Sequence, residues 1–152
     1  MTVSSGGDLP AFIPPMLAVS GKAFDAADHL FEIKWDGFRA QALIGAGTYR
    51  LLGRKRTDFT ARYPELAFLA ELPPGLALDG ELVAMVDGKP SFEHMLRSEP
   101  GVVAFVVFDV MLRAGEALVQ RPLRERREHL AEIVQDCDNP RLVLSDGVVG
   151  EG

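Results

Sequence analysis

The sequence predicts an α+β fold in which antiparallel strands are flanked by helices. Residues 30–44 alternate between apolar and polar around an Asp-Gly pair, as strands of a hairpin do. Residues 76–86 and 102–112 are long, mostly apolar segments that suit strands, and residues 64–72 and 121–136 carry apolar side chains at helical spacing. A chain of 152 residues corresponds to one domain, or most of one, and can bury a core.

At the N-terminus, residues 1–10 are small, polar and rich in glycine, so we expect a flexible tail, with the domain covering residues 11–152. The prolines in residues 12–18 predict an extended segment packed at an edge of the domain. Residues 23–29 are expected to form a short helical turn.

Residues 30–36 and 38–44 are predicted to form a β-hairpin. Charged and apolar residues alternate along the first segment, and Asp36-Gly37 is a strong signal for a two-residue turn. That turn would place Lys34 opposite Arg39 on the polar face of the hairpin.

A lysine that faces an arginine indicates a chemical role, because like charges directly opposite each other are destabilising. A nearby cation lowers the pKa of a lysine and makes its neutral, nucleophilic amine more available. Arginine also holds phosphate oxygens in a bidentate manner. Lys34 and Arg39 therefore indicate a lysine that attacks phosphorus, and the alternative is a surface hairpin with solvated charges.

A turn at residues 45–47 leads to a predicted strand at residues 48–52 and then to the only basic stretch of the chain, residues 53–62. This stretch fits phosphate contacts, either to a nucleotide or to a DNA backbone, and the alternative is a solvated loop. The stretch contains four cations, Arg54, Lys55, Arg56 and Arg62, and Arg50 precedes it. Asp58 is its only acidic residue.

A helix at residues 64–72 precedes a strand at residues 76–86, whose apolar pattern is interrupted by Asp79 and Glu81. Residues two apart in a strand share a face. Two carboxylates on one strand face could bind a divalent metal or a ribose hydroxyl. The alternative is that both side chains face solvent.

Asp87-Gly88 is predicted to close a second hairpin, and Ser91 to cap a short helix at residues 92–97, whose apolar residues pack inward. The strand at residues 102–112 is expected to be buried on both faces. Its Phe105 and Phe108 lie an odd number of residues apart, so at most one of them lines a pocket, and both could be core residues.

The last predicted elements are a helix from residue 121 to 136, with its arginines and glutamates outside, and a strand at residues 141–145. The single cysteine, Cys137, excludes an internal disulfide and a cysteine-based zinc site. No apolar run spans a membrane and no signal peptide is present, so we expect a cytoplasmic protein. The net charge of −6 argues against a free-standing nucleic-acid binder.

Several segments resemble the motifs of the covalent nucleotidyltransferases, a family of ATP-dependent DNA ligases, RNA ligases and mRNA capping enzymes. Residues 32–39 resemble the lysine motif, and residues 53–66, 78–82 and 105–110 resemble the next three motifs in the family's order. In the second motif Gly53 stands where the family has serine, and Arg56 where it has a turn glycine. The residues within these motifs are most similar to those of bacterial repair-type ligases.

The resemblance implies a partial adenylation domain of an ATP-dependent DNA ligase, with an ATP-grasp-like architecture. Lys34 would attack the α-phosphate of ATP to form AMP-lysine, for the sealing of nicks in DNA repair. Mg²⁺ would bind at Glu81 and Asp79. By motif position, Glu32 would contact the adenine amino group, Phe108 its face, Arg39 and Glu81 the ribose, and Arg54 a phosphate. The implied nucleotide-binding residues are Glu32, Ile33, Arg39, Arg54, Glu81 and Phe108.

The family's later motifs, which carry further lysines, and its OB-fold are not recognisable before Gly152. We therefore expect a domain that stops short of them and seals nicks weakly or not at all by itself. Partners would be ATP, nicked DNA and a second chain or further region that supplies the missing lysines. Two alternatives remain at this point: a non-catalytic nucleotide-binding or interaction fragment, and one half of a split ligase.

Overall fold

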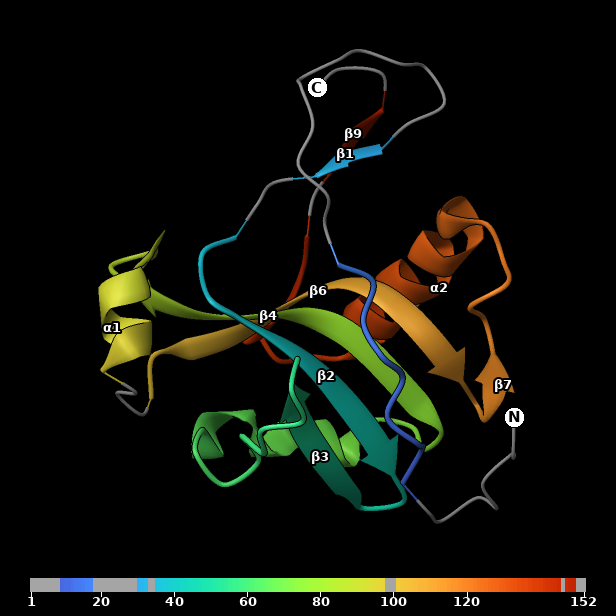
Figure 1. Ribbon diagram of the computed structural model, residues 1–152, viewed down its shortest axis with the longest axis horizontal. Helices are drawn as coiled ribbons and strands as arrows, with labels where there is room; N and C mark the ends of the chain where they lie inside the picture. The colour runs from blue at the N-terminus through green and yellow to red at the C-terminus, as the bar shows by residue number, and fades with distance from the viewer. Residues whose placement is uncertain (1–8, 18–29, 33–34, 98–100, 146, 150–152) are drawn as a thin grey trace.

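The computed structural model describes residues 9–17, 30–32, 35–97, 101–145 and 147–149. Its centre is a seven-stranded sheet of order β3-β2-β4-β6-β7, with β5 beside β4 and β8 beside β6 (Figure 1). Every pairing in this sheet is antiparallel except β6 with β8, which is parallel. The strands are β2 (Phe38–Gly45), β3 (Thr48–Gly53), β4 (Leu76–Val86), β5 (Lys89–Pro90), β6 (Val103–Arg113), β7 (Glu116–Ala117) and β8 (Leu142–Leu144).

Three helices accompany the sheet: η1 (Pro64–Glu71), a 3₁₀ helix, α1 (Phe92–Leu96) and α2 (Leu123–Asp136). Leu66 and Leu69 of η1, with Leu130 and Ile133 of α2, are buried in the main core against the sheet. The apolar spacing that predicted these two helices therefore marks their inner faces. The predicted α+β fold is confirmed.

The opposite face of the sheet is covered by the N-terminal segment, residues 9–17 (Figure 1). Phe12 and Ile13 pack on a second, smaller apolar cluster. The backbone of Ile13 exchanges two hydrogen bonds with the amide of Gln41: its N–H donates to Oε1 over 2.9 Å, and its carbonyl accepts from Nε2 over 2.6 Å. This is the extended, packed segment that the prolines predict.

The predicted hairpin of residues 30–36 and 38–44 is wrong. β1 (Leu30–Glu32) pairs instead with β9 (Gly147–Val149), in a small separate sheet (Figure 1). β2 lies between β3 and β4, so the residue opposite Arg39 is Glu81. Gly37 serves a close approach: a Cβ there would lie 2.0 Å from the carbonyl oxygen of Leu82. An Asp-Gly pair is therefore not always a turn.

The other short connections follow their sequence signals. Gly47 has a φ of 68° in the turn between β2 and β3, and Asp87-Gly88 closes the hairpin of β4 and β5 with positive φ at both residues. The Ser91 hydroxyl accepts from the backbone N–H of His94 and caps α1, as predicted.

The apolar residues of α1 were expected to pack inward, and this is correct only for Met95. Phe92 and Leu96 are 45% and 61% exposed, because a helix of five residues at one end of the sheet buries only one side. The predicted turn at residues 23–29 lies outside the described residues. Among the helices that the structure describes, none has the length and apolar character needed to cross a membrane.

Candidate active site

Three of the polar side chains predicted for function, Arg39, Asp79 and Glu81, lie on the face of the sheet that the N-terminal segment covers. In β2, residues 40, 42 and 44 enter the main core, so Arg39 and Gln41 point to the opposite face. In β4, residues 78 and 82 enter the core, which places Asp79 and Glu81 on that same face. The register of the two strands sets Arg39 across from Glu81 and Gln41 across from Asp79.

Arg39 and Asp79 form a bidentate ion pair. Nε of Arg39 donates to Oδ1 of Asp79 over 2.8 Å, and Nη2 donates to Oδ2 over 2.6 Å. The hydrogen bonds that Arg39 donates to Asp79 raise the pKa of Arg39, which keeps the guanidinium charged. Burial raises the pKa of Asp79, which is 4% exposed, and the bonds from Arg39 act against that rise.

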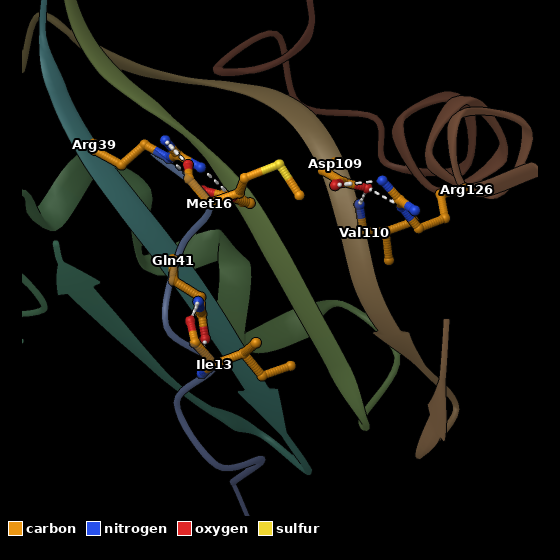
Figure 2. Close-up of polar contacts among 8 residues, drawn as sticks. Ile13, Met16, Arg39, Gln41, Asp109, Val110 and Arg126 are labelled. Carbon is orange, nitrogen blue, oxygen red and sulfur yellow. Dashed lines mark hydrogen bonds and ion pairs between the residues drawn. The ribbon is translucent and has the colours of Figure 1, made fainter. Parts of the chain in front are cut away.

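The remaining contacts of Arg39 fix the plane of its guanidinium. Nη1 donates to the carbonyl oxygen of Met16 over 3.0 Å, which joins the N-terminal segment to β2 (Figure 2). Cζ lies 4.9 Å from the centroid of the Phe108 ring, a cation–π contact with β6. Phe108 is half-buried, whereas Phe105 is fully buried in the main core, so the two aromatic residues lie on opposite sides of β6, as predicted.

Gly80, between the two carboxylates of β4, is required by the neighbouring strand. A Cβ at this position would lie 2.4 Å from the carbonyl oxygen of Val106 in β6. The register of β4 and β6 also shifts between Asp79 and Gly80. In the Asp-Gly-Glu pattern, the two carboxylates on either side of the glycine therefore lie on the site face, and the glycine itself allows β6 to approach closely.

Arg54 lies in the exposed loop after β3 and reaches the same site. Together with Arg39, Asp79 and Phe12 it lines a crevice that is too tight to admit a water molecule. Arg56 has a φ of 63°, in the left-handed region that favours glycine, at the position where the family has its turn glycine. Its Cζ lies 5.0 Å from the Phe12 ring centroid, so the side chain holds the N-terminal segment.

The glycine in place of the family's serine has a steric cause. A Cβ at Gly53 would lie 2.7 Å from the ring of Phe59. Phe59 is buried and its ring stacks on Phe38, with centroids 5.9 Å apart. The same loop is ordered by Asp58, whose pKa is lowered by hydrogen bonds from the side chain and backbone N–H of Thr60.

Two arginines of α2 were expected to face outward, and the structure corrects this. Arg126 donates from Nε to Oδ1 of Asp109 over 2.8 Å and from Nη2 to Oδ2 over 3.2 Å (Figure 2). Arg127 donates from Nη2 to the carbonyl oxygen of Ser145 over 2.6 Å. A signal for the first pair was present, because a lone carboxylate in the apolar strand 102–112 needs a cation.

Three predicted site residues are not placed. Lys34 and Ile33 lie outside the described residues, and of Glu32 only the backbone, in β1, is described. Within the described part of the chain, no group of three or more His, Cys, Asp or Glu side chains is arranged to hold a metal ion. Glu81 and Asp79 stay predictions as metal ligands, and both oxygens of Asp79 already accept bonds from Arg39.

Comparison with known proteins gives consistent matches. The family model of the ATP dependent DNA ligase domain matches residues 15–148. The SPbeta prophage-derived DNA ligase-like protein LigB of Bacillus subtilis is 32% identical over 148 residues, which cover 93% of this chain and 54% of that protein. The multifunctional non-homologous end joining protein LigD of Mycobacterium bovis is 36% identical over 143 residues, covering 89% of this chain and 19% of that protein.

Among solved structures, a mycobacterial DNA ligase D complexed with ATP and MES superposes with a TM-score of 0.80 at 34% identity. The match covers 91% of this chain and 47% of that one. The chain therefore spans about half the length of LigB and of this solved chain, and about a fifth of LigD.

Proposed function

Because this chain belongs to the ATP dependent DNA ligase domain family, we propose that it reacts with ATP to form AMP-lysine at Lys34 and passes the AMP to nicked DNA. The observation that best supports this is that residues of two other strands, β4 and β6, surround Arg39 of β2. Asp79 of β4 fixes its guanidinium, Phe108 of β6 lies against its face, and Glu81 lies opposite it.

This arrangement suits an adenosine. A half-buried aromatic ring gives a purine a flat apolar surface, and Phe108 of β6 is a half-buried aromatic residue on the site face. A carboxylate and a guanidinium beside the ring provide an acceptor and donors for ribose hydroxyls, the roles that we assign to Glu81 and Arg39. Glu32 and Ile33 remain proposals for contacts to the base, and Arg54 for a contact to phosphate.

The proposed reaction has three steps. The amine of Lys34 attacks the α-phosphorus of ATP, a nitrogen–phosphorus bond forms, the bond to pyrophosphate breaks, and the amine loses a proton. An oxygen of a DNA 5′-phosphate then attacks the same phosphorus and releases the lysine. Finally, the 3′-hydroxyl at the nick attacks the DNA phosphate, and AMP leaves with the electrons of the broken anhydride bond.

Mg²⁺ is proposed as the ion that offsets the charge of the triphosphate when it is bound. This metal is usually held by one or two carboxylates together with substrate phosphates, so it needs no all-protein cage. Glu81 fits that requirement because it is a partly exposed carboxylate on the site face. Asp79 fits it less well, since its pair with Arg39 occupies both oxygens.

The proposal is tested by the intact mass of the chain before and after incubation with ATP and Mg²⁺. We expect a gain of one AMP in the wild type, no gain in Lys34→Ala, and a normal gain in Lys89→Ala, which changes an exposed lysine of β5. The adenylylated chain should then transfer AMP to a 5′-phosphorylated nick. Binding of ATP without any adduct would contradict the proposal and favour a non-catalytic nucleotide-binding domain.

A further inference from the structure

Trp35 directly follows the proposed nucleophile, and its side chain is anchored at a distant point in the chain. Its indole N–H donates to the hydroxyl of Ser145 over 3.2 Å. Trp35 is the only tryptophan of the protein, and its side chain is half-buried. The residue next to Lys34 is thus held by a specific hydrogen bond from the C-terminal part of the domain.

Ser145 is itself fixed from two sides. It is 1% exposed, and its backbone N–H donates to the carbonyl of Val107 in β6 over 2.8 Å. Its own carbonyl accepts from Nη2 of Arg127 over 2.6 Å. Nη1 of the same guanidinium also donates to the carbonyl of Phe108 over 3.4 Å. Arg127 therefore ties the anchor of Trp35 to the aromatic residue of the site.

The other flank of the lysine segment is attached to the same piece of chain. Glu32, the last residue of β1, pairs with Gly147, the first residue of β9. Residues 33–34 thus lie between two contacts, Glu32 with Gly147 and Trp35 with Ser145, whose partners are two residues apart in sequence. Both neighbours of residues 33–34 in the sequence are therefore attached to one short part of the chain.

We propose that Ser145, supported by Arg127, is a positioning residue that sets Lys34 for attack on the α-phosphorus. This inference rests on the proposed adenylylation. The physical reason is that nucleophilic attack requires the reacting atoms to be aligned within a fraction of an ångström. A buried hydroxyl that receives the indole N–H fixes Trp35, the residue that directly follows Lys34 in the sequence.

The first test does not depend on adenylylation. The full chain is labelled with a limiting amine reagent, and the labelling rate of each lysine is read by peptide mass spectrometry as a function of pH. In Ser145→Ala we expect the profile of Lys34 to change, whereas Lys55 and Lys89, which lie in the loop after β3 and in β5, serve as internal standards and keep theirs. Ser91→Ala, which removes the cap of α1, is the matched control and leaves Lys34 unchanged.

Trp35→Phe removes the donor from the other end of the bond and should change the Lys34 profile in the same direction. If Ser145→Ala does not fold, the labelling profile of Trp35→Phe tests the inference in its place. The variant with both changes should differ little from either single variant, because each one removes the same hydrogen bond.

The second readout is the single-turnover rate of AMP-lysine formation at saturating ATP. Ser145→Ala should lower this rate by about tenfold or more, with little change in the ATP concentration that gives half saturation. An unchanged Lys34 labelling profile in both Ser145→Ala and Trp35→Phe would overturn the inference. A wild-type chain that forms no adduct would instead overturn the proposed function, and the labelling profile would still decide the role of Ser145.

Discussion

At the scale of single residues, the site depends on Arg39, whose guanidinium makes contacts through three of its nitrogens and through its face. Nε and Nη2 bond to Asp79, Nη1 bonds to Met16, and the face of the guanidinium lies against Phe108. Each contact uses a different part of a planar group with several donors, which a lysine ammonium does not have. The motif predicts Arg39 as a site residue, but its partners depend on the pairing of β2 with β4, which the sequence pattern does not reveal.

Replacing Arg39 by lysine should therefore impair both function and stability. We expect Arg39→Lys to lower the adenylylation rate by about a hundredfold, and the free energy of unfolding by about 1–3 kcal/mol, because Asp79 keeps a buried acceptor without its bidentate donor. Rates from single-turnover mass spectrometry and urea unfolding measure the two effects.

The control for this prediction is Arg50→Lys. Arg50 forms an exposed ion pair with Asp58, with side chains 49% and 50% exposed, so the change should alter stability by less than about 0.5 kcal/mol and leave adenylylation intact. Near-wild-type adenylylation in Arg39→Lys would contradict the bidentate role.

Gly37 provides a second residue-level prediction. In Gly37→Ala the new methyl group would meet the Leu82 carbonyl at 2.0 Å, so β2 and β4 must separate locally. We expect a loss of at least about 2 kcal/mol in the free energy of unfolding, measured by urea denaturation. Gly47→Ala is the comparison, because its Cβ would meet nothing within 4 Å and only its φ of +68° is unfavourable, at about 1 kcal/mol. A smaller loss of unfolding free energy for Gly37→Ala than for Gly47→Ala would contradict this prediction, because it would mean that β2 and β4 separate at little cost.

At the scale of elements, the sequence predicts β4 and η1 within a residue, and α2 with a start two residues too early, because their apolar patterns are long and bounded by Pro and Gly. It fails at residues 30–36, where alternation and an Asp-Gly pair indicate a local hairpin. The true partner of β1 is β9, far along the chain, and periodicity carries no information about which strands pair. The inward turn of Arg126 and Arg127 is missed for a related reason, since their partners lie in other elements.

The loop between β3 and η1 carries a prediction about coupled changes. Gly53→Ser should destabilise the protein by about 1–3 kcal/mol, since its Cβ would lie 2.7 Å from the Phe59 ring. Phe59→Val alone should also be destabilising, because it removes buried apolar volume and the stacking on Phe38.

The two changes together should cost less than the sum of the single costs by about 1 kcal/mol or more, because the smaller valine makes room for the serine. Thermal or urea unfolding of the four proteins gives this coupling energy. Strict additivity would mean that Phe59 does not explain the glycine at position 53.

At the scale of the whole molecule, the two faces of the sheet have different tasks. One face is covered by η1 and α2 and holds the main core, whereas the other carries the site beneath the N-terminal segment. Hydrophobic patterning predicts the first face well. The structure of the second face depends on Gln41, Arg39 and Arg56, which hold residues 9–17 through hydrogen bonds and a cation–π contact. The sequence pattern does not predict these contacts, because they join residues that only the tertiary structure brings together.

The charge of the whole molecule leads to a prediction for DNA. With a net charge of −6 and a single basic stretch at residues 53–62, the chain should bind nicked duplex weakly, through only about three phosphates. The logarithm of the binding constant should fall with the logarithm of salt concentration with a slope of about −3. Replacing exposed Arg54 and Lys55 by alanine should reduce the magnitude of that slope by about 2.

Fluorescence anisotropy of a labelled nick across a salt series measures this slope, and Lys89→Ala, which changes an exposed lysine of β5, should leave it as in the wild type. An equal slope in the Arg54 and Lys55 variant would place the DNA contacts elsewhere.

The pairing of β1 with β9 also bears on the order in which the protein assembles. Leu30 pairs with Val149, so most of the described chain lies between these two strands in the sequence. Contacts between such distant residues close a large loop and form late in folding. On the ribosome, residues 30–32 emerge long before residues 147–149, so β2, β3, β4 and β6 can pair while β1 still lacks its partner strand. The strand pairing on the N-terminal side of the proposed nucleophile thus forms only after residue 149 has been made.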